Sequence, residues 1–334
     1  MKIWKHSYLD VVMLALSVGQ FVTTLLLAIT WERASALTRV AGFVLLVWMT
    51  VYNIIVISHL FTHTPWFRSP WLNRLVSLLN SVNIGQSVQA YELTHVRNHH
   101  RYNNDQQQPD GRTQDLSSTF RDGTGGEHVS AFRYAFLGAL ETLVGIVRAH
   151  LSITRLWRVG THERDLLSLF AKSQTKRQWE VRQVQLDRLV HFFAFGLFLA
   201  ISWKWVVFCY LPAFFLALAL VNVQNYYEHY GAAPENRYAN SVSYYGRLYN
   251  LLSFNDGYHQ EHHLRPLAHW TQMPRVRREY GDKLERVERI VSPVPALLGV
   301  LHRNRQLLHR HRSTVLPSVS QGAASTLSKA AAGR

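Results

Sequence analysis

The chain has 334 residues, of which 48% are hydrophobic, and its formal net charge is +15. Its single cysteine, Cys209, excludes intrachain disulfides, cysteine-ligated zinc and cysteine-held iron–sulfur or rubredoxin centres within this chain. The basic charge fits a surface that rests on anionic headgroups or docks an acidic protein. No recognisable nucleic-acid module accompanies that charge, so we expect no nucleic-acid partner.

The apolar residues come in blocks, although the mean hydropathy is only −0.08. Residues 8–30 and 40–61 are each long enough to cross a bilayer core of about 30 Å. Residues 189–223 are too long for one span, and Ser202-Trp203-Lys204-Trp205 interrupts them with residue types that settle at a membrane interface. The sequence therefore predicts an all-α integral membrane protein with four transmembrane helices in two hairpins.

The segments between and after the hairpins are less apolar. Residues 71–91 and 132–151 carry charged side chains and are predicted to be interfacial amphipathic helices, whereas residues 103–127 are polar and predict a loop. Residues 275–290 predict a charged helix, and residues 313–334 predict a disordered tail after a single membrane domain of residues 1–312. Lysine and arginine crowd the long loops, which predicts that both termini and the large central segment share the cytoplasmic side.

Half of the 18 histidines cluster where predicted membrane segments meet the cytoplasm. They occur in HLFTH, HVRNHH, NYYEHYG and GYHQEHH, and they are His59, His63, His95, His99, His100, His229, His259, His262 and His263. Nine imidazoles exceed the needs of one zinc ion, which takes about four ligands, and suit two ions with open positions. Without a thiolate nearby, they suggest iron, zinc or copper. We predict a two-metal site held under a cytoplasmic helical cap.

The motifs HxxxH, HxxxHH and HxxHH, in this order, resemble the histidine boxes of the integral-membrane fatty acid desaturase/hydroxylase superfamily over residues 59–266. That resemblance implies a non-haem centre of two iron ions, with the eight box histidines as ligands. The centre would use O2 to attack an unactivated C–H bond of a lipid chain. His229 matches an additional histidine between boxes two and three. Asn225 matches an asparagine that in some acyl desaturases sits beside one iron, through a water.

The resemblance favours fatty acid desaturation. GYHQEHHLRP is similar to bacterial desaturase-type proteins, which implies a bacterial inner membrane with the active site on its cytoplasmic side. NYYEHYG is similar to a segment of membrane alkane and xylene monooxygenases. Hydroxylation of alkane or fatty acid chains, oxidative decarboxylation to terminal alkenes, and oxidation of sterols or carotenoids are the alternatives within the class. Outside it stand a metal transporter, whose ligands should lie near the bilayer midplane, and a non-catalytic membrane protein, which usually lacks box histidines.

Other residues are expected to support the centre. Acids near the motifs could orient the imidazole rings, namely Glu92, Asp105, Glu228, Asp256 and Glu261. No haem-binding or rubredoxin segment is fused within these 334 residues, so we expect a separate electron donor of the ferredoxin, rubredoxin or cytochrome b5 type with its reductase. A basic surface for an acidic donor is predicted at Arg265, Arg275, Arg277 and Arg278. Lipid-headgroup contact is the alternative role of these arginines.

Overall fold

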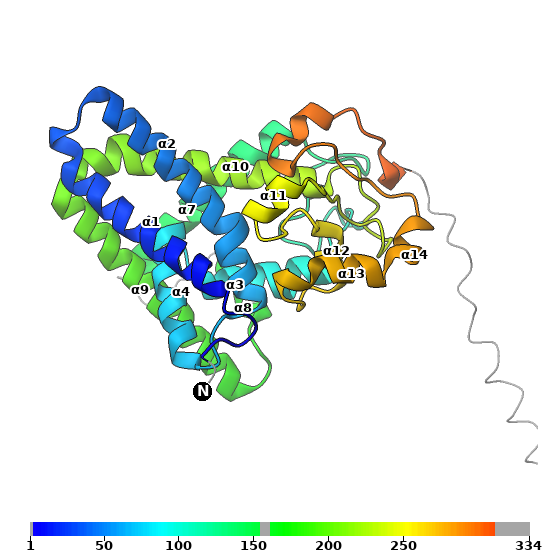
Figure 1. Ribbon diagram of the computed structural model, residues 1–334, viewed down its shortest axis with the longest axis horizontal. Helices are drawn as coiled ribbons and strands as arrows, with labels where there is room; N and C mark the ends of the chain where they lie inside the picture. Colours follow the sequence, from blue (N-terminus) through cyan, green and yellow to red (C-terminus); the bar gives the residue numbers. More distant parts are fainter. Residues whose placement is uncertain (1–2, 154–160, 311–334) are drawn as a thin grey trace, which may run out of the picture.

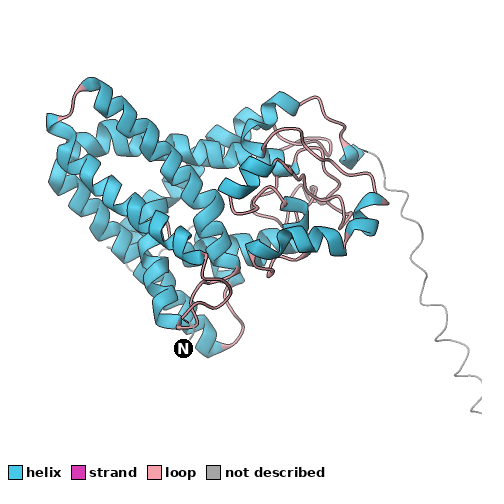
Figure 2. Ribbon diagram, in the orientation of Figure 1, coloured by secondary structure: helices cyan, strands magenta, loops and turns pink. Residues whose placement is uncertain are grey.

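The computed structural model describes residues 3–153 and 161–310, which form helices and loops. Within these ranges there are two isolated β-bridges and no strand, which confirms the all-α class. Long helices gather at one end of the molecule, and short helices and loops form a lobe at the other (Figures 1 and 2). We call this lobe, residues 103–130 and 230–310, the cap. The predicted tail 313–334 lies outside the described residues.

The first hairpin is built from two apolar helices. α1 spans Asp10–Thr30 and α2 spans Ala36–Tyr52, with the short 3-10 helix η1, Trp31–Arg33, between them. The Ser35 hydroxyl accepts from the Thr38 amide and caps the start of α2. α2 continues without a loop into the π-helix η2, Asn53–Ser58, and then into α3, His59–His63. The second helical rod of the hairpin therefore carries the first histidine motif at its end.

The second apolar run forms a bent rod. It consists of α9, Gln174–Trp205, the π-helix η4, Val206–Tyr210, and α10, Leu211–His229. Ser202 leaves helical geometry with φ −157° and ψ 96°, and α9 and α10 run in different directions from that bend (Figure 1). The predicted turn at residues 202–205 is thus a helix break at its first residue. Ser202 and Lys204 both reach Glu32 of η1, at 3.3 and 3.4 Å, which ties the bend to the first hairpin.

Three helical rods among the described residues are long and apolar enough to cross a membrane: Asp10–Arg33, Ala36–His63 and Gln174–His229. The third rod, Gln174–His229, has 56 residues. At about 1.5 Å per residue a straight rod of that length would exceed 80 Å, far more than a bilayer core requires. The bend at Ser202 divides the rod, and four crossings in two hairpins therefore stays a prediction.

The two predicted interfacial helices pack against the long ones. Residues 71–91 form α4, Pro70–Ile84, and α5, Val88–Glu92, instead of one helix. The break is at Gly85, whose φ of +67° favours glycine and whose Cβ position would lie 2.5 Å from the Phe214 ring. The other segment forms α7, Ala131–Ile153, which lies against α10, where Asn222 donates to the Ala135 carbonyl at 3.2 Å. α8 spans Thr161–Leu169.

The cap consists of short elements. They are α11, Arg247–Leu252; α12, His259–Leu264; η5, Trp270–Gln272; α13, Met273–Glu279; α14, Gly281–Glu285; η6, Ala296–His302; and η7, Leu308–Arg310. The prediction of one charged helix over residues 275–290 was wrong, because Tyr280 leaves helical geometry and the second helix ends at Glu285. The φ of Tyr280 is −103° and its ψ is 4°.

A buried acid joins the cap to the first hairpin. Asp10 is fully buried at the start of α1, and its Oδ1 accepts from the Trp270 indole at 2.9 Å and lies 3.0 Å from the Nε2 of His269. Replacing Asp10 with alanine leaves both ring nitrogens without their acceptor. We expect the free energy of unfolding to fall by about 2–4 kcal/mol, measured by denaturant titration in detergent micelles. Asp10→Asn keeps one acceptor oxygen and should lose less; equal losses would contradict this account.

Candidate metal centre

The first histidine motif lies at the end of the second rod. His59 and His63 are one helical turn apart on α3, so their imidazoles share one face, with ring centroids 5.1 Å apart. Both side chains are buried. The π-helix η2 precedes them directly, and π segments inside helices are frequent at functional sites.

A second π-helix arranges the HVRNHH motif. η3 spans Leu93–His99 and is followed by α6, His100–Tyr102. The amide of His100 donates to the carbonyl of His95, the five-residue step of a π-helix, which brings these two residues onto one face. Their Nε2 atoms are 3.2 Å apart. The side chain of His99 does not lie on the face shared by His95 and His100; its Nδ1 is directed at Asp115.

The remaining four histidines come from α10 and α12. His229 is the last residue of α10, and its Nε2 lies 3.4 Å from the Nε2 of His259. His259 and His263, one turn apart on α12, have Nε2 atoms 3.2 Å apart. His262, also on α12, places its Nε2 3.0 Å from that of His59. One short helix thus contributes to two sets of histidines.

The structure brings all nine predicted histidines together and sorts them into two groups. Potential ligand atoms lie within 4.8 Å of one another in each of two sets, which are His59, His63, His95, His100 and His262 in group one and His99, His229 and His263 in group two. His259 joins group two through its short contacts with His229 and His263. The motifs HVRNHH and HQEHH each contribute histidines to both groups.

The side chains of group two fit a bound cation. His99, His229 and His263 each direct Nδ1 at an oxygen, those of Asp115, Asn240 and Asn103, at 2.7, 3.2 and 2.8 Å. Each proton therefore lies on Nδ1, and the Nε2 atoms face one another as lone pairs without a donor between them. The Nε2 of His99 is buried and has no hydrogen-bond partner among the described residues.

The spacing of the nitrogens fits the same interpretation. Nitrogen ligands about 2.0–2.1 Å from one ion lie about 3.0–3.4 Å from each other. The Nε2–Nε2 distances in four pairs of neighbouring histidines range from 3.0 to 3.4 Å. Both groups consequently have the donor chemistry and the spacing of an imidazole metal site.

Burial favours the neutral form of five of the imidazoles. It lowers the pKa of five histidines outside the long rods well below the ordinary value, and neighbouring imidazoles lower it further; these are His95, His100, His259, His262 and His263. A neutral imidazole has a free lone pair, which is the form that binds a metal ion.

A loop residue that the sequence did not reveal orients His99. Asp115 is fully buried and accepts from His99, from the Asn104 amide at 2.7 Å and from the Ser117 amide at 2.8 Å. Burial alone would raise the pKa of Asp115, but His99 and these hydrogen bonds bring it below the ordinary value. Residues 103–127 looked like a polar loop, and nothing local distinguishes Asp115 from its exposed neighbours.

Replacing Asp115 with alanine should weaken metal binding at group two. The Nδ1–H of His99 would lose its acceptor, and changes of this kind cost about 10–100-fold in metal affinity. The measurement is iron retention by the purified protein against increasing concentrations of a competing chelator. Asp110→Ala, an exposed acid of the same loop, is the matched control. Equal retention by the two variants would contradict the role of Asp115.

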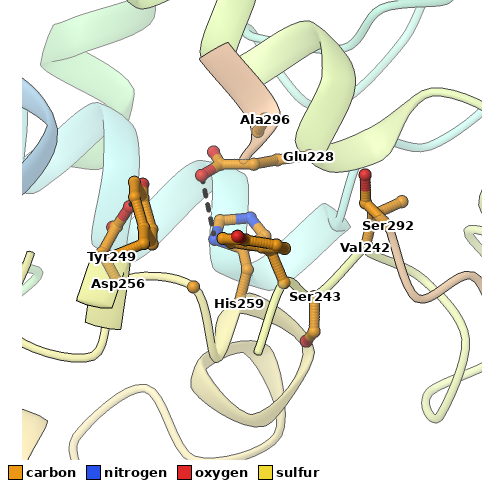
Figure 3. Close-up of a pocket in the computed structure, with 10 residues that line it drawn as sticks. Glu228, Val242, Ser243, Tyr249, Asp256, His259, Ser292 and Ala296 are labelled. Atoms are coloured by element: carbon orange, nitrogen blue, oxygen red, sulfur yellow. Dashed lines mark hydrogen bonds and ion pairs between the residues drawn. The ribbon is translucent and has the colours of Figure 1, made fainter. Parts of the chain in front are cut away.

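Two of the five predicted supporting acids face group histidines. Glu228 lies 3.7 Å from the Nδ1 of His259, and Asp256 lies 3.6 Å from the Nδ1 of His59. The Nε2 of Gln224 donates to both acids at 2.9 Å, so one amide holds the carboxylates that serve the two groups. Glu228, Asp256 and His259 line a cavity of about 10 Å³, which has room for about one water (Figure 3).

The other three predicted acids act at a greater distance. Asp105 accepts from the amides of Gln114 and Asp115 and so supports the loop that carries Asp115. Glu92 accepts from Gln89 at 2.8 Å and lies 3.4 Å from the Nε of Arg97. Glu261 accepts from Ser243 and Tyr245 at 3.0 and 2.7 Å.

Asn225 lies one turn before His229 on α10, and its side chain contacts other groups. Its amide nitrogen donates to the Tyr134 hydroxyl at 2.5 Å and to the Ser117 carbonyl at 3.4 Å. These bonds join α10 to α7 and to the loop after Asp115. A water-mediated role of Asn225 at a metal stays a prediction.

The predicted donor surface has three exposed arginines and one half-buried one. Arg265, Arg275 and Arg278 are exposed, and Arg275 pairs with Glu279 at 2.8 Å. The guanidinium of Arg277 lies 3.5 Å from the centre of the Tyr245 ring. Tyr245 donates to the buried Glu261, which precedes His262 in sequence, so this surface is one side chain away from α12.

Two buried acids of α9 hold the helices that carry the second motif. Asp187 accepts from the hydroxyls of Ser77 and Ser87 at 3.0 and 2.8 Å and from the Gln89 amide at 3.0 Å, which fixes the start of α5. Glu180 binds the guanidinium of Arg97, which lies between the histidines of HVRNHH. Neither acid was a predicted site residue, because both occur far along the chain in a different helix.

The region that carries the nine histidines matches a known protein family. The family model described as fatty acid desaturase matches residues 34–293, which include all nine histidines. The chain belongs to this family. A sphingolipid delta(4)-desaturase of Candida albicans is 48% identical over 52 residues, 15% of this chain and 14% of that protein. A sphingolipid delta(4)-desaturase DES1-like protein of Oryza sativa subsp. japonica is 26% identical over 244 residues, 70% of this chain and 62% of that protein.

The matched regions cover less than two thirds of either relative. The family match confirms the resemblance that the histidine motifs indicated. Together with the three long apolar rods, it indicates that this member of the fatty acid desaturase family associates with a membrane.

Proposed function

We propose that this desaturase-family protein is an O2-dependent oxidoreductase that introduces a double bond into a fatty acyl or other long lipid chain. The observation that carries the proposal is the arrangement of nine histidines, seven buried and two half-buried, in two groups with Nε2 lone pairs converging in each. The family match and the names of the two relatives, both sphingolipid desaturases, support a lipid substrate.

Two iron ions are the proposed cofactor, one for each histidine group. When bound, they would supply the redox chemistry that lets O2 remove hydrogen from an unactivated C–H bond. In the overall reaction O2 takes up four electrons, two from the lipid chain and two from the donor. The two hydrogens removed from the lipid chain, together with two protons from solution, convert the reduced O2 into two water molecules.

The chain's own residues orient the ligands and exclude water. Asp115, Asn103 and the Asn240 carbonyl fix the Nδ1 protons of group two, and the Ile55 carbonyl accepts from the Nδ1 of His59 at 3.1 Å in group one. His99 and His229 are 1% and 0% exposed, so bulk water does not reach their nitrogens directly. A centre assembled in this way suits a reactive oxidant that must be kept from solvent.

Hydroxylation is the second candidate reaction, because the NYYEHYG segment that ends α10 is similar to a segment of membrane monooxygenases. Decarboxylation to alkenes has no specific support from the structure. A transporter is disfavoured, because His63 and His229 lie at the ends of two apolar rods rather than at their middle.

The direct test is expression of the 334-residue chain in host membranes with a ferredoxin, a rubredoxin or a cytochrome b5 in turn, each with its reductase and NAD(P)H, followed by mass spectrometry of extracted lipids. Desaturation predicts a product lighter by two hydrogens, hydroxylation a product heavier by one oxygen, and decarboxylation an alkene shorter by one carbon. Fatty acyl chains and saturated sphingolipids are supplied in separate experiments. Iron-loaded protein that yields no oxidised lipid with either substrate class or any of the three donor types would refute the proposal.

Electrons are proposed to come from a separate donor that docks on Arg265, Arg275, Arg277 and Arg278. Charge complementarity with an acidic donor would raise the association rate and make it depend on salt. The proposed topology has four crossings, with both termini and the cap on the cytoplasmic side. The bacterial inner membrane stays a prediction.

A further inference from the structure

An open apolar groove lies between three helices, away from the histidines. It has a volume of about 370 Å³, and its walls come from α1, α4 and α9. Its lining includes Phe21, Leu79, Val82, Val190, Phe193 and Leu197. Phe193 and Leu197 are 65% and 51% exposed, so the groove opens onto the outer surface of the helices. The volume is at the lower end of the range for small-molecule sites, about 300–1,000 Å³.

The depth of the groove follows from the pairing of α1 with α4. The isolated bridge between Trp4 and Phe67 joins their N-terminal ends, and Asn83 bonds to Ser17 and Gln20 near the middle of α1. The two helices therefore run side by side in the same direction. Because α1 is an apolar candidate span, the groove at Phe21 and Val82 lies at the depth of lipid chains.

Arg74 lies between the groove and the N-terminal end of α4, at the depth expected for lipid headgroups. It precedes Leu78, another lining residue, by one helical turn, and it lies about 13 Å nearer the start of α4 than Asn83 does. Its guanidinium carbon is 4.8 Å from the Trp71 ring centre and 5.2 Å from that of Trp179. Tryptophan is enriched at this level of a membrane. The Nε of Arg74 is buried and has no hydrogen-bond partner among the described residues.

We propose that this groove binds one acyl chain of an anionic membrane phospholipid, with the lipid phosphate on Arg74. The apolar lining matches a hydrocarbon chain, and an arginine with a free donor at headgroup depth matches a phosphate. Exposed Lys176, close to Trp179 in sequence on α9, adds positive charge. No histidine of either group lines the groove, so its occupant is a resident lipid rather than the oxidised chain.

The test uses native mass spectrometry of the detergent-purified full chain, titrated with dioleoyl phosphatidylglycerol or with dioleoyl phosphatidylcholine. The two lipids share their chains and differ in headgroup charge. We expect the anionic lipid to bind about five-fold more tightly, the effect of roughly one favourable charge contact. Arg74→Gln should remove this preference, whereas Ala194→Phe, which fills the groove, should weaken the binding of both lipids.

Arg182→Gln is the matched control, because it removes an exposed positive charge from the same end of α9. If it abolishes the preference as fully as Arg74→Gln does, the effect is general surface charge and the proposal is wrong. Equal binding of both lipids by the unchanged protein, or no effect of Ala194→Phe, would also overturn it. A dimer in the same spectra that Ala194→Phe dissociates would assign the groove to a second copy of the chain instead. Unchanged unfolding temperatures establish that the variants are folded.

Discussion

Replacing His229 with alanine is expected to reduce bound iron from two ions toward one per chain and to lower lipid oxidation by more than about 100-fold. That value is the upper end of the effect of changes outside the ligand shell, and loss of a ligand should exceed it. His229 is fully buried, its Nδ1 is held by the Asn240 carbonyl, and its Nε2 faces His259 at 3.4 Å. Iron content by elemental analysis and product formation by mass spectrometry measure the two effects separately.

His302→Ala is the matched control, because His302 is a half-buried histidine outside both groups. His229→Gln keeps the size of the side chain and tests whether a loss is due to packing alone. Full iron content and full activity in His229→Ala would show that His229 lies beside the centre and is not a metal ligand. Loss of iron at group two with group one still loaded would support two separate sites.

Replacing Arg97 with methionine is expected to lower the free energy of unfolding by about 3–5 kcal/mol, the usual cost of leaving a buried charge without its partner. Glu180 is fully buried, and its carboxylate accepts from two nitrogens of Arg97 at 2.6 and 3.1 Å. The pair joins η3, which carries His95 and His99, to α9. Denaturant titration in detergent micelles measures the loss, and iron retention should fall with it.

A second replacement distinguishes charge from packing. The double variant Arg97→Met with Glu180→Met also removes the fully buried carboxylate, so most of the lost stability should return, although Glu92 still loses its contact with Arg97. Recovery should be incomplete, because the Ala171 amide also donates to Glu180 at 2.9 Å. Arg101→Met, an exposed arginine one turn further along, should change stability by less than about 0.5 kcal/mol. A double variant as unstable as Arg97→Met would contradict the charge argument.

The long helices and the histidine pairs on α3 and α12 could be predicted from the sequence, because they depend on local patterns. Blocks of apolar residues predicted the long helices, and hydropathy needs no knowledge of what a helix packs against. The spacing of HLFTH and HQEHH predicted pairs of imidazoles on one face of a helix, as α3 and α12 have them. The same motifs predicted the family, which the match over residues 34–293 confirms.

The division of the histidines depends on backbone geometry that hydropathy does not encode. An α-helix would place His95 and His100 on different faces, and the π-helix η3 brings them together while His99 turns to group two. The helix breaks at Gly85 and Tyr280 escaped prediction for a similar reason. Gly85 ends α4 where the Phe214 ring of a distant helix leaves no room for a side chain.

The sequence by itself determined which residue types could bind metal and roughly where along each apolar rod they lie. Only the tertiary structure decided which imidazoles face each other and which groups hold their Nδ1 protons. Asp115, Asn103 and the Asn240 carbonyl become partners of His99, His263 and His229 through contacts separated by 16, 160 and 11 residues. Such contacts form because buried polar groups must find partners when the helices pack, and no local pattern specifies which partner that will be.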